Sequence, residues 1–369
     1  MSRVLIMLTN NRLEDPFLHS QLINLYADTD TMFKEKILFC ETEENYFKGG
    51  FILKRNFLNT SVLKRFFLFY VAICKQLFKH RKESLVIHLR GVPASVFFLL
   101  IPTFWIRNLQ VIFDPRGLFF ENKKESYPKL KHIIKAFELV EKYYIKNASI
   151  VIAESVRLKN YWFTKYGQTQ NIITCYNASS FELKESIPMS FDSLKIVYCG
   201  SVNHWHDIDE IVRVFKDLNL FFKALNVKTE NFIFSQKKNH ECIQSKFNDF
   251  EAALTIDYIP YAQLEDVLKT MDIGVSVVKP LTSTVITSPI KIADYIFCDL
   301  LMVMNKGIGD FDDFFVENNS AFLYDYEKPL ILDKIKLATL KKENNLKLKS
   351  KFSIETNKNK VINAILAVS

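Results

Sequence analysis

Short apolar runs alternate with helical patterns along this 369-residue chain, and that alternation limits the fold more than any other feature. Strand-like runs stand at residues 4–8, 37–40, 85–89, 111–114, 150–153 and 172–174, then at 195–199, 232–234, 254–259, 272–278, 300–304 and 321–324. Helical patterns fill the intervals, at residues 61–78, 94–105, 129–146, 156–166, 208–218, 261–271, 289–297, 332–341 and 354–368. Strands alternating with helices predict parallel sheets covered on both faces, and therefore an α/β fold.

The alternation is interrupted once, by a polar stretch without apolar periodicity. We therefore predict an N-terminal Rossmann-like domain over residues 1–180, a linker over 181–194 and a C-terminal Rossmann-like domain over 195–350. A helix over 351–369 is able to pack back on the first domain. Two doubly wound domains in tandem predict a central cleft between the carboxyl ends of their strands, where α/β proteins bind ligands.

Composition excludes several classes of protein. Nine glycines, with no G-x-G-x-x-G or Walker lysine loop, argue against a glycine-rich nucleotide loop. Six scattered cysteines fit free thiols in a reducing cytosol better than disulfides or zinc. The longest apolar run, residues 92–106, is too short to span a bilayer and contains Pro102. We expect a cytoplasmic protein.

Positive charge is concentrated in the first half of the chain. Residues 1–180 contain 26 Lys and Arg against 15 Asp and Glu, which suggests a polyanionic partner. The basic side chains are interleaved with aromatic ones, at Lys54, Arg55, Lys64, Arg65, Phe66, Phe67, Phe69, Tyr70, Lys75, Lys79, Arg81 and Lys82. This pattern suits a helix lying on the anionic inner face of the cell membrane, or equally a helix with a core face and solvated lysines. No nucleic-acid-binding module is present, so we expect no nucleic acid partner.

The segment Ser288-Pro289-Ile290-Lys291-Ile292-Ala293-Asp294-Tyr295 follows one buried strand and precedes another. Ser288 is a favourable N-cap and Pro289 suits the first helical position. The helix N-terminus would present free N–H groups to an anion, with Lys291 in the first turn and Asp294 on the same face. A diphosphate would satisfy Lys291, and Asp294 could accept hydrogen bonds from a ribose diol. The alternative is a capped helix with a surface ion pair.

Further polar residues follow predicted strands. Gly200 and Ser201 come after the first strand of the second domain, where glycine lets a phosphate approach the backbone; an ordinary turn is the alternative. In the first domain, His88 and Arg90 end one strand, and Asp114-Pro115-Arg116-Gly117 ends the next. The arginines could bind phosphate or carboxylate in a fork. A core histidine and an internal Asp–Arg turn lock are the corresponding structural alternatives.

These motifs resemble those of glycosyltransferase family 4, retaining enzymes with the GT-B fold. Ser288-Pro289-x-Lys291-x-x-Asp294-Tyr295 is similar to the family's S-P-x-K-x-x-E-Y signature, and Asp114-Pro115-Arg116-Gly117 to a D-x-R-G turn in a subset of members. The runs 197–201, 257–261 and 272–275 resemble segments around the family's donor site. The resemblance implies donor-binding roles for Gly200, Ser201, His206, Lys279, Ser288, Pro289, Lys291 and Asp294. It implies catalytic roles for His88, Arg90, Asp114 and Arg116.

The chain departs from the family pattern at three places. The family's glutamate is Asp294 here, its earlier glutamate is Ile286, and the usual arginine and lysine of the phosphate loop are replaced by residues that include His206. Lys279 and Lys291 could supply the missing charge. These departures leave an attenuated or inactive homologue as an alternative.

The resemblance implies an enzyme that moves a hexose from a nucleotide-diphosphate sugar to a lipid-linked surface glycan, as in capsule or lipopolysaccharide synthesis. No D-x-D motif is present, since Asp312 and Asp313 are adjacent, so we expect no required metal or other cofactor. A nucleotide-sugar epimerase and a non-catalytic nucleotide-sugar-binding protein are the alternatives.

Overall fold

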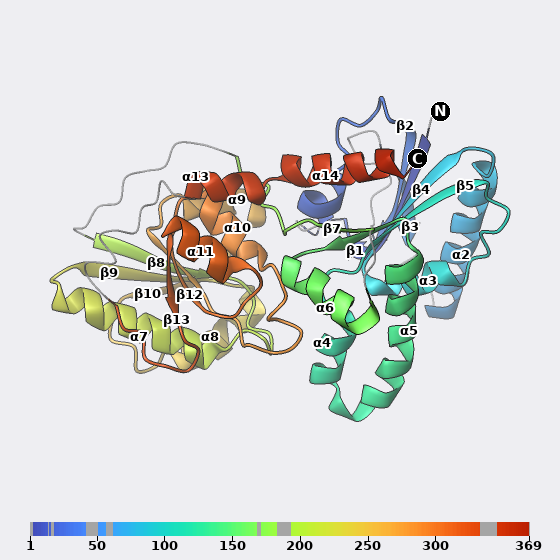
Figure 1. The fold of residues 1–369 in the computed structure, drawn as a ribbon. Helices are drawn as coiled ribbons and strands as arrows, with labels where there is room; N and C mark the ends of the chain where they lie inside the picture. The colour runs from blue at the N-terminus through green and yellow to red at the C-terminus, as the bar shows by residue number, and fades with distance from the viewer. Residues whose placement is uncertain are drawn as a thin grey trace. The chain divides into compact units, whose positions relative to one another are not determined.

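The computed structural model of the protein describes residues 3–13, 15, 18–41, 51–56, 62–167, 171–182, 193–332 and 345–368. The chain forms two compact units, one of residues 1–176 together with 354–369 and the other of residues 177–353 (Figure 1). Most of the predicted linker and the predicted helix over 332–341 lie outside the described residues. In each unit, helices alternate with strands as the apolar periodicity predicts.

The first unit is built on a seven-stranded parallel sheet in the order β3-β2-β1-β4-β5-β6-β7. Its strands are β1 (Arg3–Arg12), β2 (Phe33–Glu41), β3 (Phe51–Asn56), β4 (Ser84–Arg90), β5 (Asn108–Asp114), β6 (Ile150–Ala153) and β7 (Ile172–Thr174). Its helices are η1 (His19–Ile23), α2 (Val62–Lys79), α3 (Val92–Leu99), α4 (Phe119–Ser126), η2 (Pro128–Leu130), α5 (Lys131–Asn147), α6 (Val156–Tyr166) and α14 (Ile354–Ala367). The central strands are buried on both faces, in agreement with their continuous apolar sequences.

The second unit has a six-stranded parallel sheet in the order β10-β9-β8-β11-β12-β13. Its strands are β8 (Ser193–Cys199), β9 (Lys228–Phe234), β10 (Leu254–Asp257), β11 (Ile273–Ser276), β12 (Leu301–Asn305) and β13 (Ala321–Tyr324). Its helices are α7 (Ile208–Ala224), η3 (Lys237–Asn239), α8 (His240–Lys246), α9 (Tyr261–Leu268), α10 (Ile290–Phe297), α11 (Phe311–Asn318) and α13 (Asn345–Lys351).

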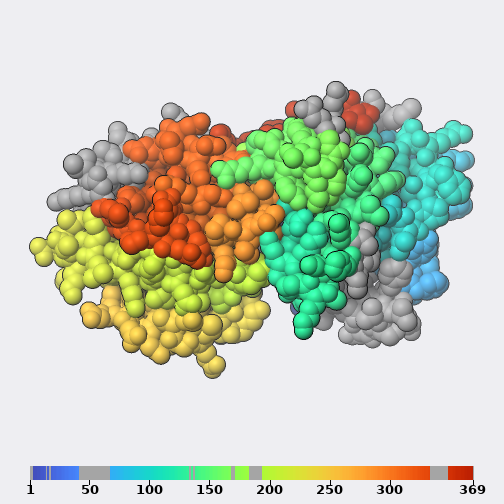
Figure 2. Space-filling view, turned by 60° about the horizontal axis from the view of Figure 1, so that its bottom comes forward, coloured from blue at the N-terminus to red at the C-terminus, as the bar shows by residue number. Residues whose placement is uncertain are grey.

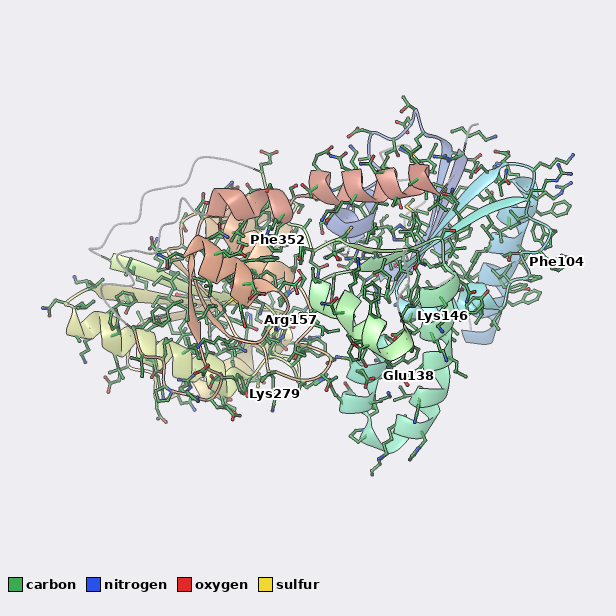
Figure 3. All side chains as sticks on the ribbon, viewed as in Figure 1. Phe104, Glu138, Lys146, Arg157, Lys279 and Phe352 are labelled. Atoms are coloured by element: carbon green, nitrogen blue, oxygen red, sulfur yellow. The ribbon has the colours of Figure 1, made fainter. Side chains whose placement is uncertain are left out.

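Several parts of the first unit differ from the sequence prediction, among them helix α4, which was not predicted. Strand β3 was not predicted, although it extends the sheet beyond β2. The predicted helix over 94–105 is wrong in its bounds, because α3 ends at Leu99, before Pro102. Phe104 therefore lies in the following loop with 91% of its surface exposed, and it points outward in Figure 3. Figure 2 shows that α4 and α5 lie at the surface of this unit.

The last helix, α14, belongs to the first unit. Its Val361 and Ile365 are fully buried in the same apolar cluster as Leu5 and Met7 of β1. The Asn357 side-chain amide donates a hydrogen bond to the Tyr176 carbonyl at 2.7 Å. The chain thus leaves the first unit after Tyr176 and returns to it at Ile354.

Tyr295 fixes α10 to the second sheet. Its buried ring lies against Gly274 of β11, where an added Cβ would come within 2.6 Å of the ring. The Cys199 amide donates to the Tyr295 phenol oxygen at 2.8 Å, at the end of β8. Only glycine at position 274 leaves room for this ring, so the tyrosine of the signature has a structural role.

Candidate functional site

Each sheet reverses its strand order at one point, and the sequence-predicted residues gather at those points. In the first unit, the order reverses between β1 and β4; in the second, it reverses between β8 and β11. Helices leave the sheet in opposite directions at such a switch point, which leaves space at the carboxyl ends of the strands for a ligand. His88 and Arg90 belong to β4, and Gly200 and Ser201 follow β8.

Three basic side chains of the first unit converge on the buried carboxylate of Asp114. Its Oδ2 atom lies 2.8 Å from Arg116 Nη2, 3.5 Å from Arg90 Nη1 and 3.4 Å from His88 Nε2. Gln21, which the sequence analysis did not identify, joins the cluster through its side-chain oxygen, 2.6 Å from Arg90 Nη2. The Asp–Arg contact within the turn, considered above as a structural alternative, is therefore present.

The hydrogen bonds of His88 determine its tautomer. A carboxylate only accepts, so Nε2 carries the proton toward Asp114, and Nδ1 accepts a hydrogen bond from the Tyr26 hydroxyl at 2.8 Å. Burial lowers the pKa of His88 despite the opposing effect of Asp114. The imidazole is thus a neutral, oriented group between β4 and β5.

The charges of the cluster compensate one another. Burial alone would raise the pKa of Asp114, but the charge of Arg116, the hydrogen bond from His88 and the charge of Arg90 lower it to about 2. Burial and the neighbouring Arg116 lower the pKa of Arg90 to about 9. At neutral pH the cluster therefore contains the Asp114 carboxylate between two guanidinium groups, and the charges of Asp15 and Glu154 also act on Arg90.

In the second unit, α10 begins one residue later than predicted. It runs from Ile290, with Pro289 at the N-cap position and no side-chain cap. The prediction that Ser288 caps it is wrong: the Ser288 hydroxyl accepts from the Asn177 amide at 3.2 Å, and the Asn177 side chain donates to the Ser288 carbonyl at 2.5 Å. Ser288 thus holds the segment where the chain enters this unit.

Lys291 is the outstanding feature of the second unit. It lies in the first turn of α10, its ammonium is buried, and it has no hydrogen-bond partner among the described residues. The nearest compensating group is the Tyr198 ring, whose centroid lies 4.1 Å from Nζ. Burial lowers the pKa of Lys291 to about 7. A buried cation without a carboxylate is costly unless an anion is supplied.

Gly200 allows Lys291 to occupy this position. A Cβ at residue 200 would lie 2.9 Å from Lys291 Nζ and 3.3 Å from the Tyr198 hydroxyl, and the φ of +152° disfavours other residues. The Tyr198 hydroxyl donates to the Ser201 carbonyl at 2.8 Å, which fixes the turn after β8. The structure therefore places the predicted glycine turn directly against the predicted lysine.

Two other predicted donor-binding residues, His206 and Lys279, differ in their surroundings. His206 lies near Lys291, and burial together with the Lys291 charge lowers its pKa to about 2, so the ring is neutral. Its Nδ1 lies 3.3 Å from the Ser201 hydroxyl. The Lys279 amide donates to the Trp205 carbonyl at 2.8 Å, but the side chain of Lys279 is exposed.

Asp294 does not pair with Lys291, so the predicted alternative of a surface ion pair is wrong. Its carboxylate is buried and accepts a hydrogen bond from the Ser179 hydroxyl at 2.6 Å. Burial raises its pKa to about 7, against the lowering effect of the Ser179 and Tyr261 hydroxyls. The structure thus connects Asp294 to the segment that enters the unit, and a role toward ribose stays a prediction.

Several residues of these clusters carry no recognisable sequence signal. Gln21, Tyr26 and Ser179 lie in unremarkable sequence surroundings, and their partners are 69, 62 and 115 positions away. Tyr198 could have been identified as a candidate site residue. It stands two positions before Gly200, so its ring is well placed to contact a cation near that turn.

No protein-family model matches the chain, and no curated protein matches it in sequence. Solved structures match over its whole length. An apo lipopolysaccharide outer core galactosyltransferase, WaaB, is 13% identical, with 100% of this chain and 99% of that chain covered and a TM-score of 0.68. The HepE protein of Anabaena in complex with UDP-glucose is 11% identical, with both chains fully covered and a TM-score of 0.67. An α,α-trehalose 6-phosphate synthase of Burkholderia multivorans is 9% identical over 100% and 99% of the two chains, with a TM-score of 0.65. The chain has the GT-B fold, as predicted.

We expect Asp114→Asn to reduce the free energy of unfolding at pH 7 by about 3–5 kcal/mol, because it removes the buried carboxylate that the Arg90 and Arg116 guanidinium groups share. The pKa of Asp114 is about 2 in the folded state and 3.8 ordinarily, so its contribution is present above pH 4 and lost as the pH falls through 2. Urea denaturation between pH 2 and 7 measures this. Asp28→Asn, at an exposed carboxylate of the same unit, is the control; equal losses from both variants would contradict the expectation.

Lys291→Met should stabilise the protein at pH 7 by roughly 1–4 kcal/mol, because an apolar side chain replaces an unpaired buried cation. The pKa of Lys291 is about 7 in the folded state against 10.5 ordinarily, so the penalty is complete below pH 7 and disappears as the pH rises toward 10.5. Denaturation at pH 7 and pH 10 tests both the sign and its decline. Lys279→Met, at an exposed lysine, should change stability by less than about 0.5 kcal/mol. A destabilised Lys291→Met protein at pH 7 would show that the ammonium has a partner.

Proposed function

We propose that this protein is a retaining glycosyltransferase of family 4 that transfers a hexose from a nucleotide-diphosphate sugar to a lipid-linked surface glycan. The observation that carries the proposal is the buried Lys291 ammonium, which has no hydrogen-bond partner in the described ranges and lies at the first turn of α10 against Gly200. A donor diphosphate supplies the anion that this position lacks. The solved structures with the same fold include a lipopolysaccharide galactosyltransferase and a complex with UDP-glucose, which supports this class of donor.

The second unit would bind the donor through charge and backbone dipoles. The free N–H groups and positive dipole end of α10 face an anion near Lys291. Gly200 lets a phosphate oxygen come close to the backbone, and the neutral His206 and Ser201 are hydrogen-bonding groups beside it. The exposed Lys279 adds charge at longer range. A ribose diol would share the Asp294 carboxylate with the Ser179 hydroxyl.

The first unit would orient the sugar and the acceptor. The guanidinium groups of Arg90 and Arg116 suit a phosphate or an acidic acceptor, and the neutral His88 suits a sugar hydroxyl. In a retaining transfer, the acceptor oxygen bonds to the anomeric carbon on the face from which the phosphate leaves. The bond from that carbon to the phosphate oxygen breaks, and the acceptor proton passes to the leaving phosphate. This chemistry asks the protein for positioning and charge stabilisation, and we propose that it needs no metal.

Binding of UDP at pH 8 should be accompanied by uptake of nearly ~1 proton per nucleotide, because a lysine with a pKa of about 7 becomes protonated beside a diphosphate. At pH 6 the lysine already carries its proton, so little uptake is expected. Isothermal calorimetry in two buffers of different ionisation enthalpy measures the number. Release of free UDP from a UDP-sugar only when a glycan acceptor is present would then distinguish a transferase from a binding protein.

The matched variants for this experiment are Lys291→Met and Asp294→Asn. Lys291→Met should lose both the binding and the proton uptake while remaining folded. Asp294→Asn should weaken binding but keep the uptake per bound nucleotide, because it leaves the lysine in place. UDP bound equally well by Lys291→Met, at an unchanged proton number, would refute the donor site.

We further propose that the first unit rests on the anionic inner face of the cell membrane. Helix α2 presents Phe67 and Phe78 with 63% and 58% of their surfaces exposed, on the same face as the exposed Lys75. Phe69 and Tyr70 instead pack against Phe97, so part of the predicted aromatic cluster belongs to the core. The side chains of Lys54, Arg55, Lys64, Arg65 and Phe66 lie outside the described residues. No helix in the described part of the chain is long and apolar enough to cross a membrane.

We expect the protein to sediment with anionic vesicles at 0.1 M salt and to be released at 1 M, where the Debye length falls from about 10 Å to about 3 Å. The triple variant Lys75→Gln, Lys82→Gln and Phe104→Ser should reduce binding without lowering the melting temperature much, because all three side chains are exposed. Equal sedimentation with neutral and anionic vesicles would show that charge is not responsible.

A further inference from the structure

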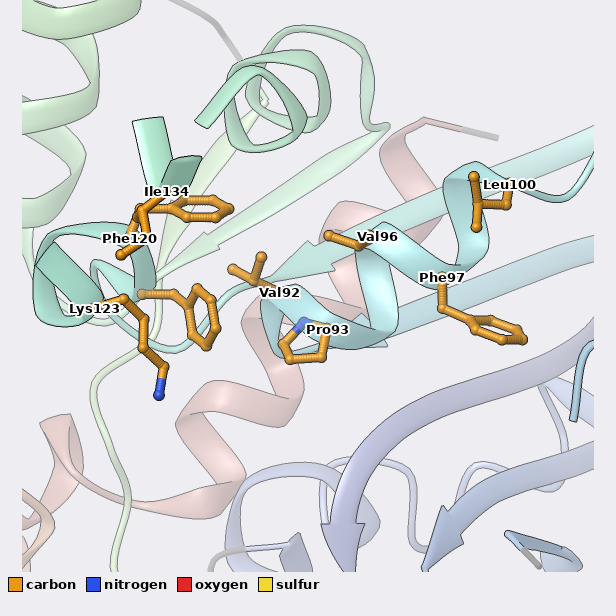
Figure 4. A pocket seen from close by; sticks show the side chains of 9 residues that line it. Val92, Pro93, Val96, Phe97, Leu100, Phe120, Lys123 and Ile134 are labelled. Carbon is orange, nitrogen blue, oxygen red and sulfur yellow. The ribbon is translucent and has the colours of Figure 1, made fainter. Parts of the chain in front are cut away.

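An apolar cavity of about 400 Å³ lies in the first unit between α3, α4 and the start of α5. Nine side chains line it, and eight of them are apolar. Val92 and Val96 of α3 form one wall, Phe120 of α4 and Ile134 of α5 form another, and Leu100 lies toward the surface (Figure 4). The volume is at the lower end of the range of roughly 300–1,000 Å³ that small-molecule sites occupy. Space of this kind accommodates one hydrocarbon chain.

Lys123 is the one charged residue of the lining. Its ammonium lies over the rings of Phe119 and Tyr127, at 5.5 and 5.6 Å from their centroids, and it pairs with no carboxylate in the described part of the chain. The adjacent Lys124 is different, because it forms ion pairs with Glu121 and Glu138. Lys123, which lines the apolar cavity, can therefore bind an external anion without breaking an ion pair, whereas Lys124 cannot.

The surroundings of the cavity favour an anionic amphiphile over a neutral apolar ligand. Residues 123–135 contain five lysines and one glutamate, and Lys129, Lys131 and Lys135 are exposed. Leu100, at the rim, has 58% of its surface exposed. The Tyr70 hydroxyl of α2 donates to the Leu100 carbonyl at 3.5 Å, so the rim continues into the helix whose outer face carries Phe67 and Phe78.

We propose that this cavity binds the hydrocarbon chain of a single-chain lipid phosphate, with its phosphate beside Lys123. The cavity supplies the apolar contact, and the uncommitted ammonium supplies the charge. In terms of the proposed function, such a molecule is the lipid end of the acceptor; that identification rests on the proposed function, whereas the binding itself does not.

Calorimetric titration with straight-chain monoalkyl phosphates below their micellar concentrations tests the proposal in the absence of nucleotide. Affinity should rise about fourfold for each added methylene, and then level off once the chain fills the cavity. Alcohols of the same chain length should bind several-fold more weakly. An affinity that does not change with chain length would overturn the proposal. Because no nucleotide is present, this failure is distinct from failure of the donor site.

Variants separate the cavity from the surface. Lys123→Gln should lower the affinity for an alkyl phosphate to that for the alcohol, whereas Lys129→Gln, at an exposed lysine of the same segment, should leave it unchanged. Val96→Trp should fill the cavity and abolish binding of both ligands while vesicle binding persists. If Val96→Trp does not fold, Leu100→Asp, at the end of the cavity away from Lys123 (Figure 4), should still weaken binding by placing a carboxylate against the hydrocarbon chain. Binding unchanged in Val96→Trp or in Leu100→Asp, or binding only to vesicles, would refute the site, as would a dimer closed over this face in sedimentation analysis.

Discussion

The polar end of the first sheet depends on one buried carboxylate, that of Asp114. It is the common counter-ion of Arg90 and Arg116, and it also accepts from His88. Two guanidinium groups this close would repel each other strongly in a protein interior, where effective dielectric constants are low. The same residue's carbonyl accepts from the Gly91 amide at 2.7 Å, so the end of β5 also holds the turn that follows β4. Charge compensation and backbone geometry are thus determined together at the switch point.

The second unit handles charge in the opposite way. Lys291 is also buried, but beside it lie a tyrosine ring and the start of α10, and no counter-ion is found among the described residues. The protein therefore tolerates an electrostatic cost at the place where a diphosphate would remove it. This is the usual relation between stability and function, in which a binding site is held in an arrangement that is unfavourable until the ligand arrives. Tyr295, packed on Gly274, makes that arrangement rigid.

The order of the strands and helices could be predicted because it depends on local apolar periodicity. Every predicted strand is present, several with identical bounds, such as Ile150–Ala153 and Ala321–Tyr324. Helix α4 was missed because its sequence, FFENKKES, has almost no apolar period. Residue types and spacing singled out Lys291 and Gly200, which the structure places side by side, and Asp114 and Arg116, which form an ion pair. They could not identify Gln21 or Ser179, because these partners meet only through tertiary packing over 69 and 115 positions.

The signature around α10 shows how a motif can be found correctly and interpreted only in part. Its lysine is buried without a hydrogen-bond partner among the described residues, whereas its serine and aspartate hold the segment of residues 177–179. A spacing pattern records which positions share a helix and a turn. It does not show which residues from other parts of the chain form hydrogen bonds with the residues at those positions.

The return of α14 to the first unit has a consequence for how the protein forms. Val361 and Ile365 complete a core in which Leu5 and Leu38 precede them by more than 300 residues. A ribosome makes the chain from its N-terminus, so the second unit has emerged before the first can close. The second unit is continuous in sequence and is able to fold as synthesis proceeds, while the first keeps part of its apolar cluster uncovered. The second unit can therefore complete its core before the first unit does, although the first unit begins the chain.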